Sequence, residues 1–235
     1  MSRLQLFCFT YAGGTSSFLD EIENDLPEID FVKLEYAGHG ARHKEPLYQN
    51  FDELADDIFP RVKEAYRGEE YALFGYSMGT ITLAEVLKRI VADGKMALPK
   101  RVFLVAHEPQ TWGYLDDLSD AEVAEWVKQR TLKFGAVPER LINNKTYWRV
   151  YLPLYTADYS IIGKYKFEDL NLHVSIPVTA FYSEQDVPLA KMEKWKKYFT
   201  GEFETQCFEG THFFIQQHHA EMAEIIRSNM SVKEQ

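Results

Sequence analysis

The octapeptide LFGYSMGT, residues 73–80, joins an apolar run to a stretch with helical spacing. Within it, Ser77 lies between Gly75 and Gly79. A Gly-x-Ser-x-Gly passage between a strand and a helix is typical of a strained turn that exposes a serine nucleophile, because side chains at the glycine positions would clash with that turn. An ordinary glycine-rich turn gives the same pentapeptide. The stretch alone therefore leaves both interpretations open.

Apolar, β-prone runs recur on both sides of this stretch and alternate with segments of helical spacing. The expected strands are 4–9, 30–36, 71–76, 101–107, 177–183 and 203–209. The expected helices are 51–66, 78–94, 119–135, 145–162, 189–199 and 215–230. Near-continuous apolar strands that alternate with helices indicate a mainly parallel sheet covered on both faces. The sequence therefore predicts the α/β class, with a kink or break at Pro60 in the first of these helices.

The strand–helix alternation lapses over residues 111–171, which are rich in Trp, Tyr and Leu at helical spacing. A Ser-x-x-Glu capping box at Ser119 marks the start of its first helix. We expect this segment to be a helical lid inserted into a core formed by residues 1–110 and 172–235. A mobile lid over Ser77 would exclude water from the site. The alternative is a rigid cap that completes the core.

Charge and cysteine content exclude some functions. The 235 residues carry a formal net charge of −10, which disfavours nucleic acid as a partner because its recognition rests on Lys and Arg. Cys8 and Cys207 lie in apolar runs and are interpreted as buried free thiols in a reducing compartment. No run approaches the roughly 20 apolar residues of a membrane span. We expect a soluble, cytoplasmic protein.

A serine hydroxyl needs a general base that is oriented by a third group. In folds with this turn, the acid and then the histidine follow the serine along the chain. The segment FYSEQDVPLA places Asp186 in the loop after a strand, and FEGTHFFI places His212 between the next strand and the last helix. Catalytic groups gather at such strand ends in open α/β sheets. The proposed triad is Ser77, Asp186 and His212.

The acid and the histidine of this triad have alternatives. Glu184 is a second candidate acid, and Asp186 could serve only as a turn or cap residue. His212 could be a hydrogen-bonded loop histidine without a catalytic role, while His218 and His219 lie inside a helix and are expected to be solvated. The other histidines show no spacing with Cys or Glu that resembles a zinc site, so neither a metal nor a cofactor is expected.

The negative charge that develops on the substrate oxygen also needs donors. The segment FTYAGGTSS, residues 9–17, follows the first strand, and its small side chains let backbone N–H groups approach a ligand. The expected donors are the amide of Met78, directly after the serine, and one amide from this loop. A tight turn at Gly13 and Gly14 is the alternative reading of the same segment.

Over nearly its full length, the chain resembles the type II thioesterases, the stand-alone α/β-hydrolases that accompany nonribosomal peptide and polyketide synthases. FTYAGGTSS resembles the family's Phe-Pro-(His/Tyr)-Ala-Gly-Gly-Ser loop, and YAGHGARHKEP resembles its Pro-Gly-Arg-Gly-x-Arg-x-x-Glu-Pro segment. FGYSMG is similar to Phe-Gly-His-Ser-Met-Gly, and FEGTHFF to Phe-x-Gly-Gly-His-Phe-Phe. LPLYTADYSIIGKY resembles the lid segment Leu-Pro-x-Leu-Arg-Ala-Asp-Phe.

This resemblance implies an α/β-hydrolase fold with an inserted helical lid, and a thioesterase without a cofactor. It implies that the amide of Ala12 is the second oxyanion donor and that Ser77, Asp186 and His212 form the triad. The substrate implied is an acyl or aminoacyl thioester on the phosphopantetheine arm of a carrier protein, cleaved through an acyl-enzyme for editing or product release. A monomer is expected.

The chain also departs from the family pattern. Tyr76 replaces the histidine beside the nucleophile, Thr211 replaces a glycine beside His212, and Thr156 replaces the lid arginine. These changes leave the triad intact but bear on the acyl pocket and its entrance. A general carboxylesterase or lipase, an acyl-transferring enzyme and a non-catalytic binding protein on the same fold are the rival functions.

A carrier protein is typically acidic, as this chain is, so docking must depend on a local surface. One candidate is the lysine-rich segment KMEKWKKYF, although helical spacing splits its lysines between faces and favours a solvated surface: Lys191, Lys194, Lys196 and Lys197. An apolar lid rim is the other candidate. We expect weak, short-lived docking, with the pantetheine arm entering between lid and core.

Overall fold

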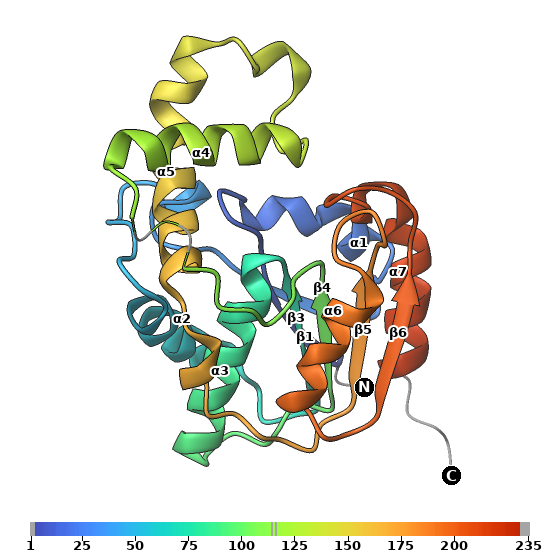
Figure 1. Ribbon diagram of the computed structural model, residues 1–235. Coiled ribbons are helices and arrows are strands. Elements are labelled where there is room, and N and C mark those ends of the chain that lie inside the picture. The colour runs from blue at the N-terminus through green and yellow to red at the C-terminus, as the bar shows by residue number, and fades with distance from the viewer. Residues whose placement is uncertain (1–2, 114, 116, 231–235) are drawn as a thin grey trace.

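A six-stranded sheet forms the centre of the computed structural model, which describes residues 3–113, 115 and 117–230 (Figure 1). The strand order is β2-β1-β3-β4-β5-β6, and every neighbouring pair is parallel. The strands are β1 (Gln5–Phe9), β2 (Asp30–Leu34), β3 (Tyr71–Tyr76), β4 (Arg101–Val105), β5 (Val178–Tyr182) and β6 (Phe203–Cys207). The predicted parallel α/β sheet is confirmed.

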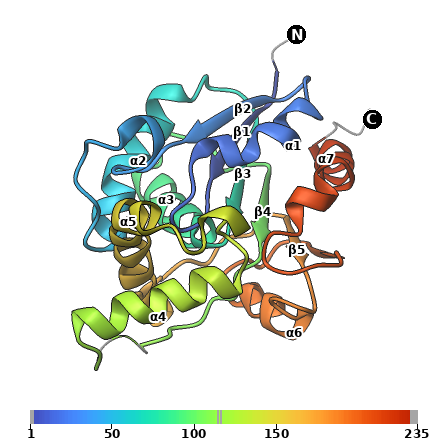
Figure 2. The ribbon, with the colours of Figure 1, turned by 90° about the horizontal axis from the view of Figure 1, so that it is seen from above.

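Helices cover both faces of this sheet. The α-helices of the described residues are α1 (Asp20–Asn24), α2 (Phe51–Ala65), α3 (Met78–Asp93), α4 (Asp120–Lys133), α5 (Lys145–Lys164), α6 (Leu189–Met192) and α7 (Ile215–Met230). Figure 2 shows α1 and α7 on one side of the sheet and α2 and α3 on the other. The side chains of β1 alternate accordingly: Leu6 and Cys8 pack with α1 and α7, whereas Phe7 and Phe9 pack with α2 and α3. This two-sided burial explains why the central strands are apolar throughout.

The structure corrects or narrows three expectations of the sequence. Cys207 is exposed, not buried, because β6 is an edge strand, whereas Cys8 in the central β1 is buried as expected. Of the kink or break expected at Pro60, the break is absent: α2 continues through the proline, and apolar side chains on both sides of it bury against the core. The continuous helix expected over 189–199 is the short α6 followed by a tighter 3-10 helix, Glu193–Lys197, which places Trp195 in the core.

Helices α4 and α5 occupy the chain between β4 and β5. In Figure 1, α4 crosses α5, and both lie above the carboxyl ends of the strands. The predicted capping box at Ser119 is present, with Glu122 accepting from the backbone N–H of Ser119 at 2.9 Å. Side chains of α4 and α5 share an apolar cluster that is separate from the two core clusters, and its members include Val123, Val127 and Trp148. The two helices therefore pack as one unit on the sheet edge where a site is expected.

None of the helices in the described part of the chain is both long and apolar enough to cross a membrane.

Candidate active site

Ser77 occupies the turn between β3 and α3 in a strained backbone conformation. Its φ is 54° and its ψ is −117°, a region that residues other than glycine rarely adopt. A Cβ on Gly75 would lie 2.5 Å from the carbonyl oxygen of Gly79, and one on Gly79 would lie 2.1 Å from that of Phe9. Both glycines are thus required by close backbone packing around the serine. Of the two interpretations of LFGYSMGT, the structure shows the strained turn.

A chain of hydrogen bonds leads from Ser77 to His212 and Asp186. The distance from Ser77 Oγ to His212 Nε2 is 2.9 Å, and His212 Nδ1 lies 2.8 Å from Asp186 Oδ2. The side chains of His212 and Asp186 are 6% and 7% exposed. The structure therefore brings together the three residues that the sequence proposed, from loops that follow β3, β5 and β6.

The rival residues are engaged elsewhere. Glu184 is exposed, and its carboxylate accepts from the backbone N–H of Leu189 at 3.2 Å. His219 Nδ1 lies 2.6 Å from Asp25 Oδ2, and His218 Nε2 lies 3.1 Å from the carbonyl oxygen of Glu209. The side chains of His218 and His219, expected to be solvated, are 21% and 34% exposed. The hydrogen-bonding geometry favours Asp186 over Glu184 as the partner of His212.

Tyr76 has a positioning role that sequence reasoning missed. Its hydroxyl donates to the backbone carbonyl oxygen of His212, and its ring is fully buried against Phe18 and Phe213. Burial raises the pKa of the Tyr76 hydroxyl well above its ordinary value, so the hydroxyl stays protonated and can donate. The departure from the family pattern at this position thus fixes the loop that carries His212. Only its place beside Ser77 hinted at this role.

The loop after β1 lies at the same site. Ala12 lines the cavity around Ser77 and His212, and Met78 is buried at the first position of α3. Amides in the first turn of a helix have no partner within that helix, so the Met78 N–H is available to a ligand. These positions are compatible with the two oxyanion donors expected from the sequence.

Asp158, on α5, fastens this loop from the other side. Its Oδ2 accepts from the backbone N–H of Gly13 at 2.6 Å and lies 2.9 Å from His39 Nε2. Burial lowers the pKa of His39, but the Asp158 carboxylate outweighs burial, and the net pKa lies above its ordinary value. A Cβ on Gly13 would lie 2.0 Å from the ring of Tyr155, so only glycine fits beneath α5. Helix α5 and the loop after β1 are therefore held together by a buried polar contact.

The cavity above Ser77 has a volume of about 330 Å³. Core residues form one wall, and the opposite wall comes from α4 and the segment after β4, including Trp112, Arg130 and Phe134. The Phe134 ring stacks on the imidazole of His212, with centroids 4.3 Å apart, and the Arg130 guanidinium lies 4.5 Å from the Phe134 centroid. The helical insertion thus covers the imidazole directly.

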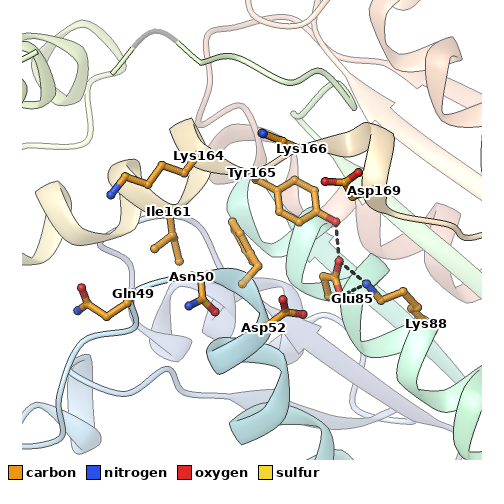
Figure 3. Close-up of a pocket in the computed structure, with 11 residues that line it drawn as sticks. Gln49, Asn50, Asp52, Glu85, Lys88, Ile161, Lys164, Tyr165, Lys166 and Asp169 are labelled. Carbon is orange, nitrogen blue, oxygen red and sulfur yellow. Dashed lines mark hydrogen bonds and ion pairs between the residues drawn. The ribbon is translucent and has the colours of Figure 1, made fainter. Parts of the chain in front are cut away.

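A second cavity, of about 310 Å³, lies between the start of α2, the middle of α3 and the end of α5 (Figure 3). Within it, Glu85 accepts from the Tyr165 hydroxyl at 2.7 Å and from Lys88 Nζ at 2.9 Å. The Glu85 side chain is 4% exposed, so these partners are needed to offset its burial. This network fastens the end of α5 to α3, and we assign the cavity a structural role.

The fold and the serine turn define the class first: the chain is an α/β-hydrolase. A family model described as Thioesterase domain matches residues 4–230. Thioesterase TesA from Mycobacterium marinum is 30% identical over 217 residues, which cover 89% of this chain and 84% of TesA.

Two solved structures are similar over almost the whole chain. The type II thioesterase BorB from the borrelidin biosynthetic cluster has a TM-score of 0.82 at 26% identity, covering 98% of this chain and 94% of BorB. ClbQ from the colibactin pathway has a TM-score of 0.87 at 24% identity, covering 97% of each chain. The protein belongs to the thioesterase domain family and is a hydrolase that acts on thioesters. The resemblance to type II thioesterases is confirmed.

Proposed function

We propose that this enzyme hydrolyses acyl or aminoacyl thioesters on the phosphopantetheine arm of carrier proteins in nonribosomal peptide or polyketide synthesis. The observation that carries the proposal is the chain of hydrogen bonds from Ser77 through His212 to Asp186, at a strained turn in a member of the thioesterase family. The relatives from antibiotic and other biosynthetic clusters supply the substrate class. Editing and product release are both compatible with this site.

Acylation begins when Ser77 Oγ attacks the thioester carbonyl carbon while His212 Nε2 takes the hydroxyl proton. The backbone amides of Ala12 and Met78 hold the negative charge on the carbonyl oxygen. The carbon–sulfur bond then breaks, the thiol leaves with the proton from His212, and the acyl group remains on Ser77. Asp186 accepts a hydrogen bond from Nδ1–H of His212, which keeps Nε2 free to act as the base.

Deacylation repeats these steps with water. His212 removes a proton from the water as its oxygen attacks the acyl carbon, and the same two amides hold the oxyanion. Collapse of the tetrahedral intermediate returns the proton to Ser77 Oγ and releases the acid.

The domain division proposed is a core, residues 1–110 and 172–235, with a lid, residues 111–171. The separate apolar cluster of α4 and α5 and the stacking of Phe134 on His212 support this division. In this arrangement the lid excludes water from the acyl-enzyme and moves to admit substrate.

The carrier protein is proposed to dock on the apolar rim of the lid. Val150 and Tyr151 of α5 are 59% and 41% exposed, although both carry large hydrophobic side chains. In contrast, the lysine-rich segment uses its charges locally, with Lys191 and Lys194 both paired to Glu108. Docking through the rim fits a transient interface between two acidic proteins. We propose a monomeric enzyme that works in the cytoplasm.

The direct test compares kcat/KM for one acyl group on intact carrier protein, on free pantetheine and in a simple oxygen ester. We expect the order carrier, then pantetheine, then ester. Equal values for carrier and pantetheine would mean that the carrier is not recognised. A preference for the ester would favour the second candidate, a general carboxylesterase.

A further inference from the structure

His107 is a buried imidazole in the wall of the catalytic cavity to which the proposed mechanism gives no role. It follows β4, and its side chain is 6% exposed. Neither of its ring nitrogens has a hydrogen-bond partner among the residues that the structure describes. A buried polar group without a partner costs free energy, so its retention at a ligand cavity calls for a functional reason.

Three hydrogen bonds fix the backbone of Val105, Ala106 and His107. The carbonyl oxygen of Val105 accepts from the Ser77 N–H at 2.8 Å, and the Ala106 N–H donates to the carbonyl oxygen of Phe181 at 3.2 Å. The carbonyl oxygen of His107 itself accepts from Trp195 Nε1 at 2.7 Å. Between these contacts Ala106 has a φ of 57°, the left-handed region that alanine rarely adopts. This strained turn, one residue past the strand beside Ser77, fixes the side chain in the cavity wall.

The ring of His107 is packed between aromatic side chains. The Trp112 ring stacks on it with centroids 6.0 Å apart and an interplanar angle of 11°, and the Phe167 ring lies 6.2 Å away. Burial and the nearby His212 lower the pKa of His107 to about 4. At neutral pH the ring is therefore uncharged, with one nitrogen that donates and one that accepts.

An uncharged imidazole suits only some substrate groups. A hydroxyl or an amide both donates and accepts, so either can satisfy both kinds of ring nitrogen. A carboxylate can bond only a ring nitrogen that carries the proton. An ammonium group can bond only the unprotonated nitrogen and would lie near the positive charges of Arg130 and Lys133, which line the same cavity.

We propose that His107 is a specificity-determining residue, which hydrogen-bonds a hydroxyl or amide group of the thioester substrate. The inference rests on the proposed function and names the substrate class of the same site. Such a group can belong to the acyl chain or to the pantetheine arm, which contains amides. The hydrogen bond selects between thioesters of equal length, because an analogue without the group leaves the imidazole unpaired.

The test uses His107→Phe, which keeps the aromatic packing but removes both nitrogens, and His107→Gln, which keeps one donor and one acceptor. Four thioesters of one chain length are compared, with and without a 3-hydroxyl group on the acyl chain and with and without amides in the leaving thiol. A fifth substrate carries a terminal carboxylate. Melting temperature is measured for both variants to show that they fold.

For wild type we expect kcat/KM to be higher for the substrate with the polar group than for the matched substrate without it. His107→Phe should reduce the ratio of these two kcat/KM values about tenfold or more. His107→Gln should restore most of it. If His107→Phe loses the preference for the 3-hydroxyl substrate, the contact lies on the acyl chain. If it loses the preference for the thiol with amides, the contact lies on the pantetheine arm. Unchanged ratios in folded His107→Phe, or an effect confined to the carboxylate substrate, would overturn the inference. Failure of wild type to hydrolyse any of the thioesters would instead contradict the proposed function.

Discussion

The two walls of the catalytic cavity are held in different ways. On the core wall, Ser77 and His212 are fixed by parallel strands, a strained turn and hydrogen bonds of their backbone and side chains. On the lid wall, Phe134 contacts the imidazole only through ring stacking. Stacked rings can separate without leaving a buried polar group unpaired. Breaking the hydrogen bonds of the core wall would leave such groups unpaired. We infer that the core wall carries out the chemistry, and that movement of the lid wall controls the entry of substrate.

The same contrast divides the lid itself. Helix α5 is tied to the core by Asp158 at the loop after β1 and by Tyr165 at α3. Helix α4 packs on α5 through the apolar cluster that they share and reaches the core through Phe134. If the lid opens, α4 is therefore expected to move more than α5.

The largest effect is expected from Ser77→Ala, which removes the nucleophile from the rigid wall. Turnover should fall by about 10⁵-fold or more, as in other serine hydrolases that lose this residue, with folding retained. Steady-state hydrolysis and circular dichroism measure the two properties. His218→Gln is the matched control and should leave turnover within a factor of about two. Near-normal turnover in folded Ser77→Ala would place the chemistry elsewhere.

Asp186→Asn should lower turnover by roughly 10⁴-fold, because the amide no longer stabilises the His212 tautomer that leaves Nε2 free. Glu184→Gln, two residues away and exposed, should change little. Comparing kcat for the two variants separates the candidate acids. A greater loss in Glu184→Gln would reverse the assignment.

Asp158→Asn tests the tie between α5 and the core. It removes the negative charge of a buried pair, so we expect a loss of about 3 kcal/mol in the free energy of unfolding. Because Gly13 lies beside Ala12, we also expect kcat to fall by about tenfold while KM changes less. Denaturant unfolding and steady-state kinetics measure these effects. Full stability together with unchanged kcat would show that the contact positions nothing.

The His39–Asp158 pair also predicts a pH dependence of stability. Because folding raises the pKa of His39, the stabilisation is fully present below the unfolded value of about 6.5 and is lost as pH rises through the folded pKa. The difference in unfolding free energy between wild type and His39→Gln should therefore be larger at pH 6 than at pH 9. A difference that grew with pH would contradict the charged pair.

The smallest expected effect is a difference in hydrogen exchange between the two lid helices of the unmutated enzyme. Backbone amides of α4 should exchange with solvent deuterium faster than those in the second half of α5, and substrate binding should slow the α4 exchange. Equal protection of both helices, as slow as in β3 and unaffected by substrate, would favour the rigid cap over the mobile lid.

The sequence predicted the sheet and the proposed triad because both depend on local patterns. Apolar strands mark a buried parallel sheet, and Ser77, Asp186 and His212 each lie in a recognisable strand-end loop. The buried pair of His39 and Asp158 was not predicted, since its members are 119 residues apart. Each lies in a segment that resembles a family motif, YAGHGARHKEP or LPLYTADYSIIGKY, but neither segment indicates that the two pair.

The errors have a similar origin. The exposure of Cys207 depends on β6 being an edge strand, and strand order is a tertiary property that a local apolar run does not encode. The cavity position of His107, for which no prediction was made, depends on the strained turn at Ala106, a residue type that gives no sequence signal for a positive φ.

The central claim is that a thioester transfers its acyl group to Ser77 before water releases it. The most direct measurement is mass spectrometry of the intact enzyme, quenched within the first turnover on an acyl carrier protein and then mapped by peptide digestion. We predict a mass increase equal to the acyl group, located on Ser77 in wild type, longer-lived when deacylation is slowed, and missing in Ser77→Ala. Hydrolysis by wild type without any acyl adduct, or with the adduct on another residue, would contradict the account.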